Sequence, residues 1–190
     1  LRLIRQILDL AKIEDSRLKL DLRQQDVVAF TRYLGESYAV SAEKKQIAFE
    51  LETPPGPVMM DFDSQRLQEI LDNLFSNALK FTPEGGRICM ALTCPHARML
   101  RVSVSDDGVG IDAGDQDKIF DRYYQANRQS MGSAGGSGIG LAYCKALVTL
   151  MEGTISVSSK PGQGSVFTIE LPIRKEAQTG QQFSVVSNVE

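Results

Sequence analysis

The sequence of 190 residues has little of what marks several classes of protein. Its cysteines, Cys89, Cys94 and Cys144, are odd in number and lack metal-ligand spacing, so we expect reduced thiols rather than disulfides or a zinc centre. No apolar run is long enough to cross a membrane, and no signal peptide is seen. Basic residues form no cluster and the net charge is -3, which argues against nucleic-acid binding. With 42% hydrophobic residues, we expect a cytoplasmic domain with one full core and an appendage.

One predicted helix carries an unusual polar stripe. Apolar residues over 67–81 recur at helical spacing, while Glu69, Asn73, Asn77 and Lys80 lie together on another face. Asparagine side-chain oxygens suit magnesium, and a lysine ammonium suits phosphate oxygens. An ordinary solvated helix face explains the stripe equally well if no phosphate-binding loop follows it.

Two glycine-rich segments do follow the stripe. Residues 100–105 alternate as a strand and lead into Asp-Asp-Gly-Val-Gly-Ile at 106–111, which places a carboxylate beside backbone that a flat ring can approach closely. The second segment, residues 132–141, opens a predicted helix whose unpaired amide hydrogens suit anionic phosphate. A glycine pair alone is more often a turn, but the order of these features on one chain is far more specific.

These segments resemble the boxes of the sensor histidine kinases. The stripe helix resembles their N box, and the later boxes follow in the expected order: 106–111 the first glycine box, 119–124 the F box, 135–141 the second glycine box, and 162–167 the closing Gly-x-Gly-[Ser/Thr]-x-Phe signature. The resemblance implies the Bergerat ATP-binding fold shared with DNA gyrase, the Hsp90 chaperones and the MutL proteins. This is an α+β two-layer sandwich, in which helices cover one face of a mixed, mostly antiparallel sheet, and a flexible lid covers ATP and Mg²⁺.

The resemblance also implies roles for single residues. Asn73 matches the magnesium-binding asparagine, Asn77 the second asparagine near the phosphates and ribose, and Lys80 the phosphate-contacting lysine. Phe81 stands where the family usually has tyrosine, and Asp106 matches the aspartate that accepts a hydrogen bond from the adenine amino group. Further positions match the nucleotide and lid contacts of the glycine and F boxes: Gly108, Gly110, Ile111, Phe120, Arg122, Gln125, Gly136, Ser137, Gly138, Ile139, Gly140 and Leu141.

Three positions qualify this picture. Gln125 replaces an arginine that in many members reaches the γ-phosphate, and either Arg122 or Arg128 could substitute for it. The only histidine, His96, falls in a predicted hairpin loop and is not expected to be the phosphoacceptor, whose helix is missing. Glu69 takes the position where ATPase relatives place a water-activating carboxylate, so as a catalytic residue its role stays open.

We divide the chain into the end of a helical dimerisation domain (1–17), a linker (18–25), the ATP-binding catalytic domain (26–174) and a polar tail or linker (175–190). Because the chain does not begin with methionine, we expect a fragment of a longer protein. The predicted elements of the catalytic domain, besides the stripe helix, are a helix over 26–44 capped by Asp26, strands over 47–52 and 58–61, a hairpin of 87–93 and 99–105, an irregular lid over 113–137, a helix over 138–151, and strands over 154–159 and 165–171.

The resemblance implies a protein-histidine kinase domain. It would transfer the γ-phosphate of Mg-ATP to a histidine of its own dimerisation domain, for relay to the aspartate of a response-regulator receiver domain, either separate or fused. The full-length protein would be a homodimer, with this part in the cytoplasm and no nucleic-acid partner. Two alternatives stay open: an ATP-hydrolysing or serine-kinase member of the same fold, and a degenerate nucleotide-binding module, for which Phe81 and Gln125 are mild evidence.

Overall fold

The computed structural model describes residues 2–126 and 136–176, and these contain five helices and seven strands. The helices are α1 (Arg2–Glu14), α2 (Val27–Glu43), α3 (Ser64–Phe81), α4 (Ala113–Gln116) and α5 (Gly140–Leu150). The strands are β1 (Arg23–Asp26), β2 (Ala48–Glu52), β3 (Met59–Phe62), β4 (Arg87–His96), β5 (Met99–Asp106), β6 (Thr154–Ser159) and β7 (Ser165–Pro172). In the described ranges, no helix is both long and apolar enough to span a membrane.

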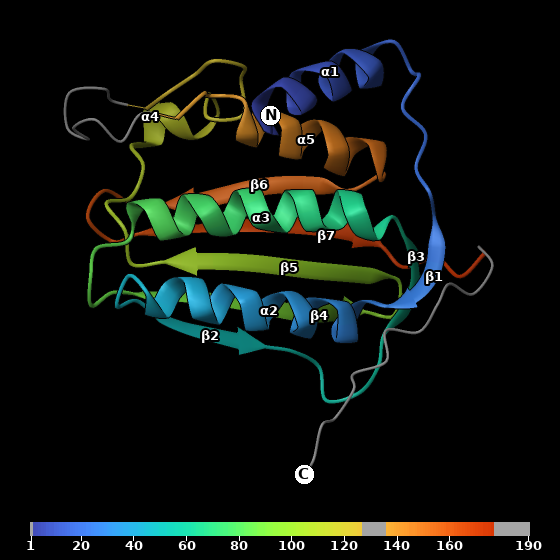
Figure 1. The fold of residues 1–190 in the computed structure, drawn as a ribbon, viewed down its shortest axis with the longest axis horizontal. Coiled ribbons are helices and arrows are strands. Elements are labelled where there is room, and N and C mark those ends of the chain that lie inside the picture. The colour runs from blue at the N-terminus through green and yellow to red at the C-terminus, as the bar shows by residue number, and fades with distance from the viewer. Residues whose placement is uncertain (1, 127–135, 177–190) are drawn as a thin grey trace.

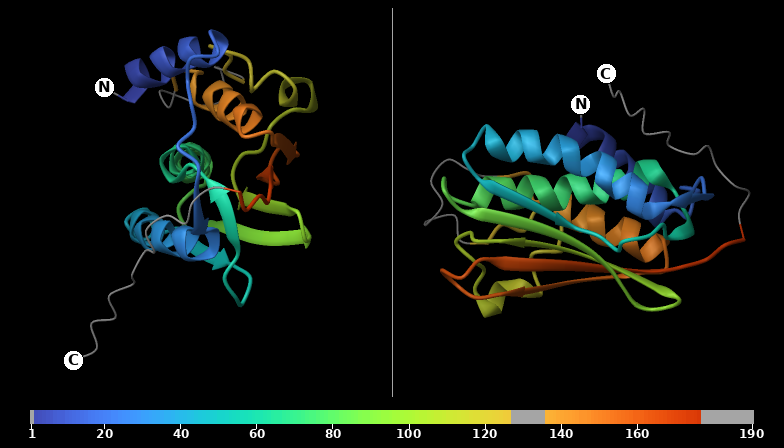
Figure 2. Two further views of the ribbon diagram at one scale, coloured as in Figure 1. Left: turned by 90° about the vertical axis from the view of Figure 1, so that its right-hand side faces the viewer. Right: turned by 90° about the horizontal axis from the view of Figure 1, so that it is seen from below.

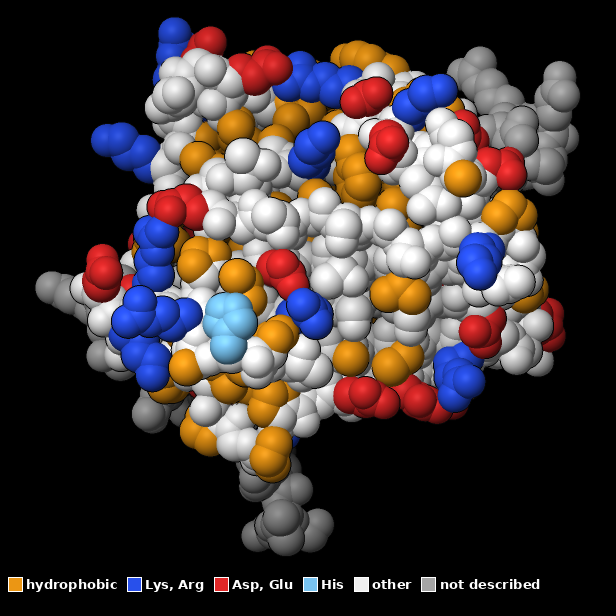
Figure 3. Space-filling model, turned by 180° about the vertical axis from the view of Figure 1, so that it is seen from behind, with side chains coloured by type: hydrophobic (Ala, Val, Ile, Leu, Met, Phe, Trp, Pro, Cys, Tyr) orange, Lys and Arg blue, Asp and Glu red, His pale blue; other side chains and the backbone are white. Residues whose placement is uncertain are grey.

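Five strands form one mixed sheet in the order β2–β4–β5–β7–β6 (Figure 1). Only β2 and β4 run parallel, and the other neighbouring strands pair antiparallel. Helices α2, α3 and α5 cover one face of this sheet, and α1 lies above α5 as an additional layer (Figures 1 and 2). Seen from behind, the molecule shows a surface of mixed polar, charged and apolar side chains (Figure 3). The predicted α+β two-layer architecture is therefore confirmed.

Alternation along the central strands builds the core. Inward residues of β4 and β5, such as Met90 and Val104, are fully buried, while the residues between them are more exposed. The apolar side of α3 packs onto them and is equally buried, as the helical spacing predicts. The buried members of this side of α3 are Leu67, Ile70, Leu71, Leu74, Phe75 and Ala78.

Aspartates begin the two long helices that cover the sheet. The side chain of Asp26 accepts a 3.0 Å hydrogen bond from the backbone nitrogen of Val28, which confirms the predicted cap of α2. Asp63 accepts from the backbone nitrogen of Arg66 at 3.1 Å and so caps α3. Because α3 starts at Ser64, the predicted stripe helix begins three residues before its first predicted apolar residue, Leu67.

Three sequence predictions are corrected. The predicted linker 18–25 contains most of β1, which pairs antiparallel with β3 in a separate two-stranded sheet. The sequence of β1 is short and polar, so its strand conformation depends on the pairing with β3. The predicted hairpin loop 94–98 is shorter, because β4 continues past a register shift to His96, which pairs with Met99 and is exposed (Figure 3, pale blue). The predicted irregular lid includes the short helix α4, and its residues 127–135 lie outside the described ones.

Candidate nucleotide-binding site

The polar stripe of α3 faces the start of α5. A Cβ atom added to Gly140 would lie 3.0 Å from Oδ1 of Asn73, and one added to Gly136 would lie 3.5 Å from Nζ of Lys80. The backbone of the second glycine box therefore runs directly along the stripe. Since α5 begins at Gly140, the unpaired amides of its first turn are close to Asn73. This juxtaposition is the one expected of a phosphate site.

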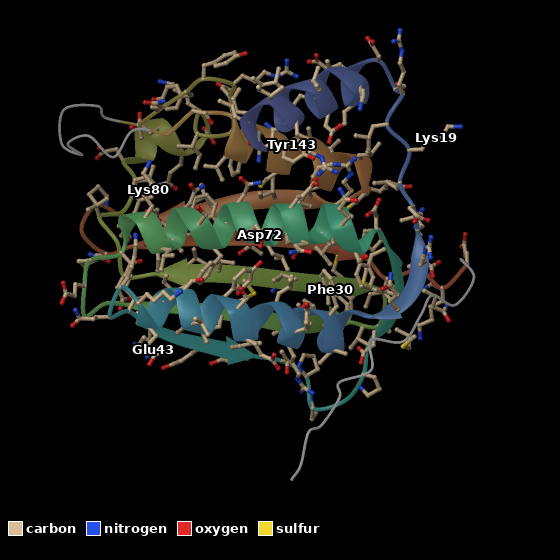
Figure 4. All side chains as sticks on the ribbon, in the orientation of Figure 1. Lys19, Phe30, Glu43, Asp72, Lys80 and Tyr143 are labelled. Carbon is tan, nitrogen blue, oxygen red and sulfur yellow. The ribbon has the colours of Figure 1, made fainter. Side chains whose placement is uncertain are left out.

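Side chains of the stripe differ in their exposure. Asn73 is only 8% exposed, whereas Glu69, Asn77 and Lys80 are half-buried. Lys80 lies at the C-terminal end of α3 (Figure 4), with Nζ 4.7 Å from the centre of the Phe81 ring. Burial holds the pKa of Lys80 below its ordinary value of 10.5. A partly desolvated ammonium gains more from a phosphate oxygen than a fully hydrated one.

Asp106 lies at the end of β5, next to the first glycine box and the C-terminal end of α3. It is 8% exposed and accepts a 2.8 Å hydrogen bond from the backbone nitrogen of Gly108. Burial raises the pKa of this carboxyl, and hydrogen bonds from the backbone of Gly108 and Ser165 partly offset that effect. A Cβ atom at Gly108 would lie 2.8 Å from the carbonyl oxygen of Phe81, so only glycine lets the first glycine box pack on the end of α3.

The closing signature, residues 162–167, packs against the backbone of Asp106. Gly164 has a φ of +76°, and a Cβ atom there would lie 1.8 Å from the backbone oxygen of Asp106. Ser159 accepts a 2.8 Å hydrogen bond from the backbone nitrogen of Ile111 and donates to the backbone oxygen of Gly164. The signature thus links the first glycine box to β6 and β7. Its sequence pattern gave no hint of this structural role.

The F box packs against the sheet and contacts the second glycine box. Phe120 meets Phe167 edge-on, with ring centres 6.5 Å apart. Gln125 donates a hydrogen bond from its side-chain nitrogen to the backbone oxygen of Gly136. Arg122 forms an ion pair with Glu14 of α1. Of the two arginines that could replace the missing family arginine, Arg122 is therefore engaged by α1, and Arg128 lies outside the described residues.

Helix α1 also reaches the stripe. Nε2 of Gln6 donates a 3.2 Å hydrogen bond to Oδ1 of Asn73, while Nδ2 of Asn73 donates to the backbone oxygen of Glu69 at 2.7 Å. The second bond fixes the orientation of the carboxamide, with its oxygen turned toward α1 and Gly140. One neutral amide oxygen suits a hard cation that keeps several of its waters, so Asn73 fits magnesium.

Four further side chains form a network with Glu69, and the sequence predicted none of them as a site residue. Arg66 of α3 and Tyr143 of α5 contact the Glu69 carboxylate directly, and Asp9 of α1 accepts hydrogen bonds from both of them. Gln65 donates to the other oxygen of Glu69 at 3.2 Å. The only signal in the sequence is the presence of Gln6 and Asp9 beside the broad apolar side of α1.

Comparison with known proteins shows the family to which this chain belongs. The family described as histidine kinase-, DNA gyrase B-, and HSP90-like ATPase matches residues 62–175. The chain therefore belongs to this family, and it is an ATP-binding domain. TmoS of Ectopseudomonas mendocina and RcsC of Salmonella typhimurium, both sensor histidine kinases, are each 36% identical to it, over 91% and 100% of this chain. Within the family, the chain is thus a catalytic domain of the histidine-kinase type.

Solved structures agree with this assignment. Full-length ShkA, in a crystal structure with AMPPNP, is 29% identical, has a TM-score of 0.79, and is matched over 93% of this chain and 36% of its own. The catalytic domain of the histidine kinase ThkA, at 24% identity, shares the fold with a TM-score of 0.71 over 82% of this chain and all (100%) of its own. The chain spans only 18% and 19% of the length of TmoS and RcsC.

Proposed function

We propose that this domain binds Mg-ATP and transfers the γ-phosphate to a histidine of a dimerisation domain, for relay to a receiver aspartate. The observation that carries the proposal is the contact of Asn73 with the first turn of α5, because it joins a magnesium-type ligand to a phosphate-type helix start. The sensor histidine kinases to which the chain is similar support the reaction type.

Adenine would bind at the Asp106 end of the site. The buried carboxylate there offers an acceptor to the adenine amino group, whereas guanine presents an oxygen at that position. Gly108 lets the backbone of the first glycine box pack closely on the end of α3 beside this carboxylate. The phosphates would then extend along the stripe toward Lys80, Asn77 and Asn73. Asn73 would hold Mg²⁺, which when bound neutralises phosphate charge.

Transfer would depend on positioning more than on chemistry supplied by the protein. An imidazole nitrogen of the acceptor would bond to the γ-phosphorus while the bond to the β–γ bridging oxygen breaks, so that ADP leaves and the imidazole loses its proton to solvent. Lys80 and the amides of α5 would stabilise the charge on the moving phosphoryl group. The exposed apolar side of α1 supports a dimerisation hairpin, since another helix would cover it: its members are Leu3, Ile4, Ile7 and Leu8.

Calorimetric titration with an ATP analogue, with and without Mg²⁺, tests the binding step. Wild type should bind in a Mg²⁺-dependent way, Asn73→Ala should lose the Mg²⁺-dependent part, and the control Ser76→Ala, exposed on the same helix, should bind as wild type does. Absence of binding by wild type would refute the catalytic proposal. Labelling of an added histidine-bearing dimerisation domain from γ-labelled ATP then separates a histidine kinase from an ATPase or serine kinase of the same fold.

A further inference from the structure

A cluster of polar side chains from three helices lies beside the candidate phosphate site. Nη1 of Arg66 is 2.7 Å from Oδ2 of Asp9 and 2.8 Å from Oε2 of Glu69, and the Tyr143 hydroxyl donates to the same Glu69 oxygen at 2.6 Å. Figure 4 shows Tyr143 in the layer between α1 and α3. The side chains of Asp9, Arg66 and Glu69 are 4%, 14% and 22% exposed, so water screens these charges only weakly.

The donors around Glu69 weaken it as a base. Burial by itself would raise the pKa of Glu69, but hydrogen bonds from Tyr143, Arg66 and Gln65 outweigh it and hold the pKa below 4.5. Tyr143 keeps its proton, because burial and the Glu69 carboxylate both raise its pKa. Both oxygens of Glu69 already accept hydrogen bonds. A carboxylate of low pKa with engaged oxygens is a poor acceptor for a proton from water.

The weak basicity of Glu69 matters because of its position near the candidate magnesium ligand. It lies one helical turn before Asn73 on the same stripe, and Cβ atoms four residues apart on a helix are about 5–6 Å from each other. With Mg-ATP held at Asn73, a basic Glu69 would be well placed for hydrolysis. In that reaction a water oxygen bonds to the γ-phosphorus, the bond to the β–γ bridging oxygen breaks, and a water proton passes to the carboxylate.

We propose that Arg66 and Tyr143 are positioning residues that keep Glu69 from activating water, so that bound ATP is retained for transfer. This inference rests on the proposed function. Asp9 supports the arrangement from α1, because it shares the Arg66 nitrogen that binds Glu69. Residues of three helices, α1, α3 and α5, thereby limit the hydrolysis of bound ATP. The contribution of α1 depends on its packing beside α5.

The test measures ATP hydrolysis without any acceptor domain. Tyr143→Phe removes one donor but keeps the ring, and Tyr33→Phe, at a position 59% exposed on α2, is the matched control. Hydrolysis by Tyr143→Phe should rise about tenfold at neutral pH, as expected when a general base gains basicity. The acid limb of its pH–rate profile should move to higher pH. Tyr33→Phe should behave as wild type does.

Glu69→Gln variants decide whether Glu69 is responsible. Tyr143→Phe combined with Glu69→Gln should abolish the rise, so that hydrolysis returns to the rate of Glu69→Gln alone. Unchanged hydrolysis in a Tyr143→Phe protein that binds the ATP analogue normally would overturn the inference, and so would a raised rate that persists in the double variant. A clear loss of hydrolysis in Glu69→Gln alone would overturn it even if Tyr143→Phe did not fold. Failure of the proposed function is recognised separately, by absent ATP binding in wild type.

Discussion

Gln6 of α1 donates a 3.2 Å hydrogen bond to Oδ1 of Asn73, the oxygen that we propose as the magnesium ligand. Both side chains are 8% exposed, so the bond is shielded from water. Glu14, eight residues further along the chain, pairs with Arg122 of the F box. Helix α1 therefore contacts the candidate site at two of the positions assigned to nucleotide binding.

Removing the Gln6 side-chain amide should tighten Mg²⁺-dependent nucleotide binding. In Gln6→Ala, Oδ1 of Asn73 no longer has to give up a hydrogen bond worth about 0.5–1.5 kcal/mol, so affinity should rise about threefold or more. Titration of Mg²⁺ at a fixed concentration of ATP analogue measures the effect, with Arg5→Ala on the exposed side of α1 as control. Weaker binding by Gln6→Ala would mean that Gln6 orients Asn73 for the cation instead of competing with it.

Acid should loosen the attachment of α1. Burial alone would raise the pKa of Asp9, but the hydrogen bond and charge of Arg66 hold it below 3.8, and the pKa of Glu69 lies below 4.5. Because these folded-state values are depressed, the stabilisation is fully present above the unfolded values and is lost as pH falls through the folded ones. The thermal midpoint should be steady above about pH 5 and fall below about pH 4.

Thermal unfolding of wild type and Asp9→Asn over this range provides the measurement. Asp9→Asn should be less stable at neutral pH and should lose less on acidification. The exposed Asp117 offers a control, since Asp117→Asn should retain the acid response of wild type. An acid response of wild-type size in Asp9→Asn would count against the ion pair as its source.

Alanine variants of Gly164 and Gly162 test how much the close packing of Gly164 on the Asp106 backbone contributes to stability. Both have positive φ, +76° and +73°, but an added Cβ atom would collide with the Asp106 backbone only at Gly164, and at Gly162 it meets nothing within 4 Å. Gly162→Ala should cost about 1 kcal/mol from backbone strain, and Gly164→Ala about 3 kcal/mol or more. Urea unfolding with an unchanged m-value measures the difference. Equal losses would show that the close approach is relieved by a small backbone shift.

Local patterns predicted the parts of the fold that depend on neighbouring residues. The spacing of apolar residues identified α3 and its buried face, and Asp26 was recognised as a cap because its contact to Val28 is local. The glycine boxes marked where backbone approaches backbone, and Gly108 and Gly140 do meet Phe81 and Asn73 closely. Their assigned roles toward nucleotide stay predictions.

Contacts between distant segments could not be predicted in this way. Gln6 and Asn73 are separated by 67 positions, and periodicity carries no information about which helices become neighbours. Strand β1 escaped notice for a related reason: the polar sequence Arg-Gln-Gln-Asp has no apolar alternation, and its strand conformation comes from pairing with β3. No sequence pattern singled out Arg66 or Tyr143, and only the fold brings them to Glu69.

The hydrogen bond between Tyr143 and Asp9 joins positions 134 residues apart, and this separation bears on how the protein is made. At synthesis rates of about 5–20 residues per second, roughly 7 to 27 seconds pass between the emergence of Asp9 from the ribosome and that of Tyr143. Throughout this interval, the polar side of α1 lacks the partner that α5 provides. Slower translation would lengthen this interval, during which α1 cannot complete its contacts with the rest of the domain.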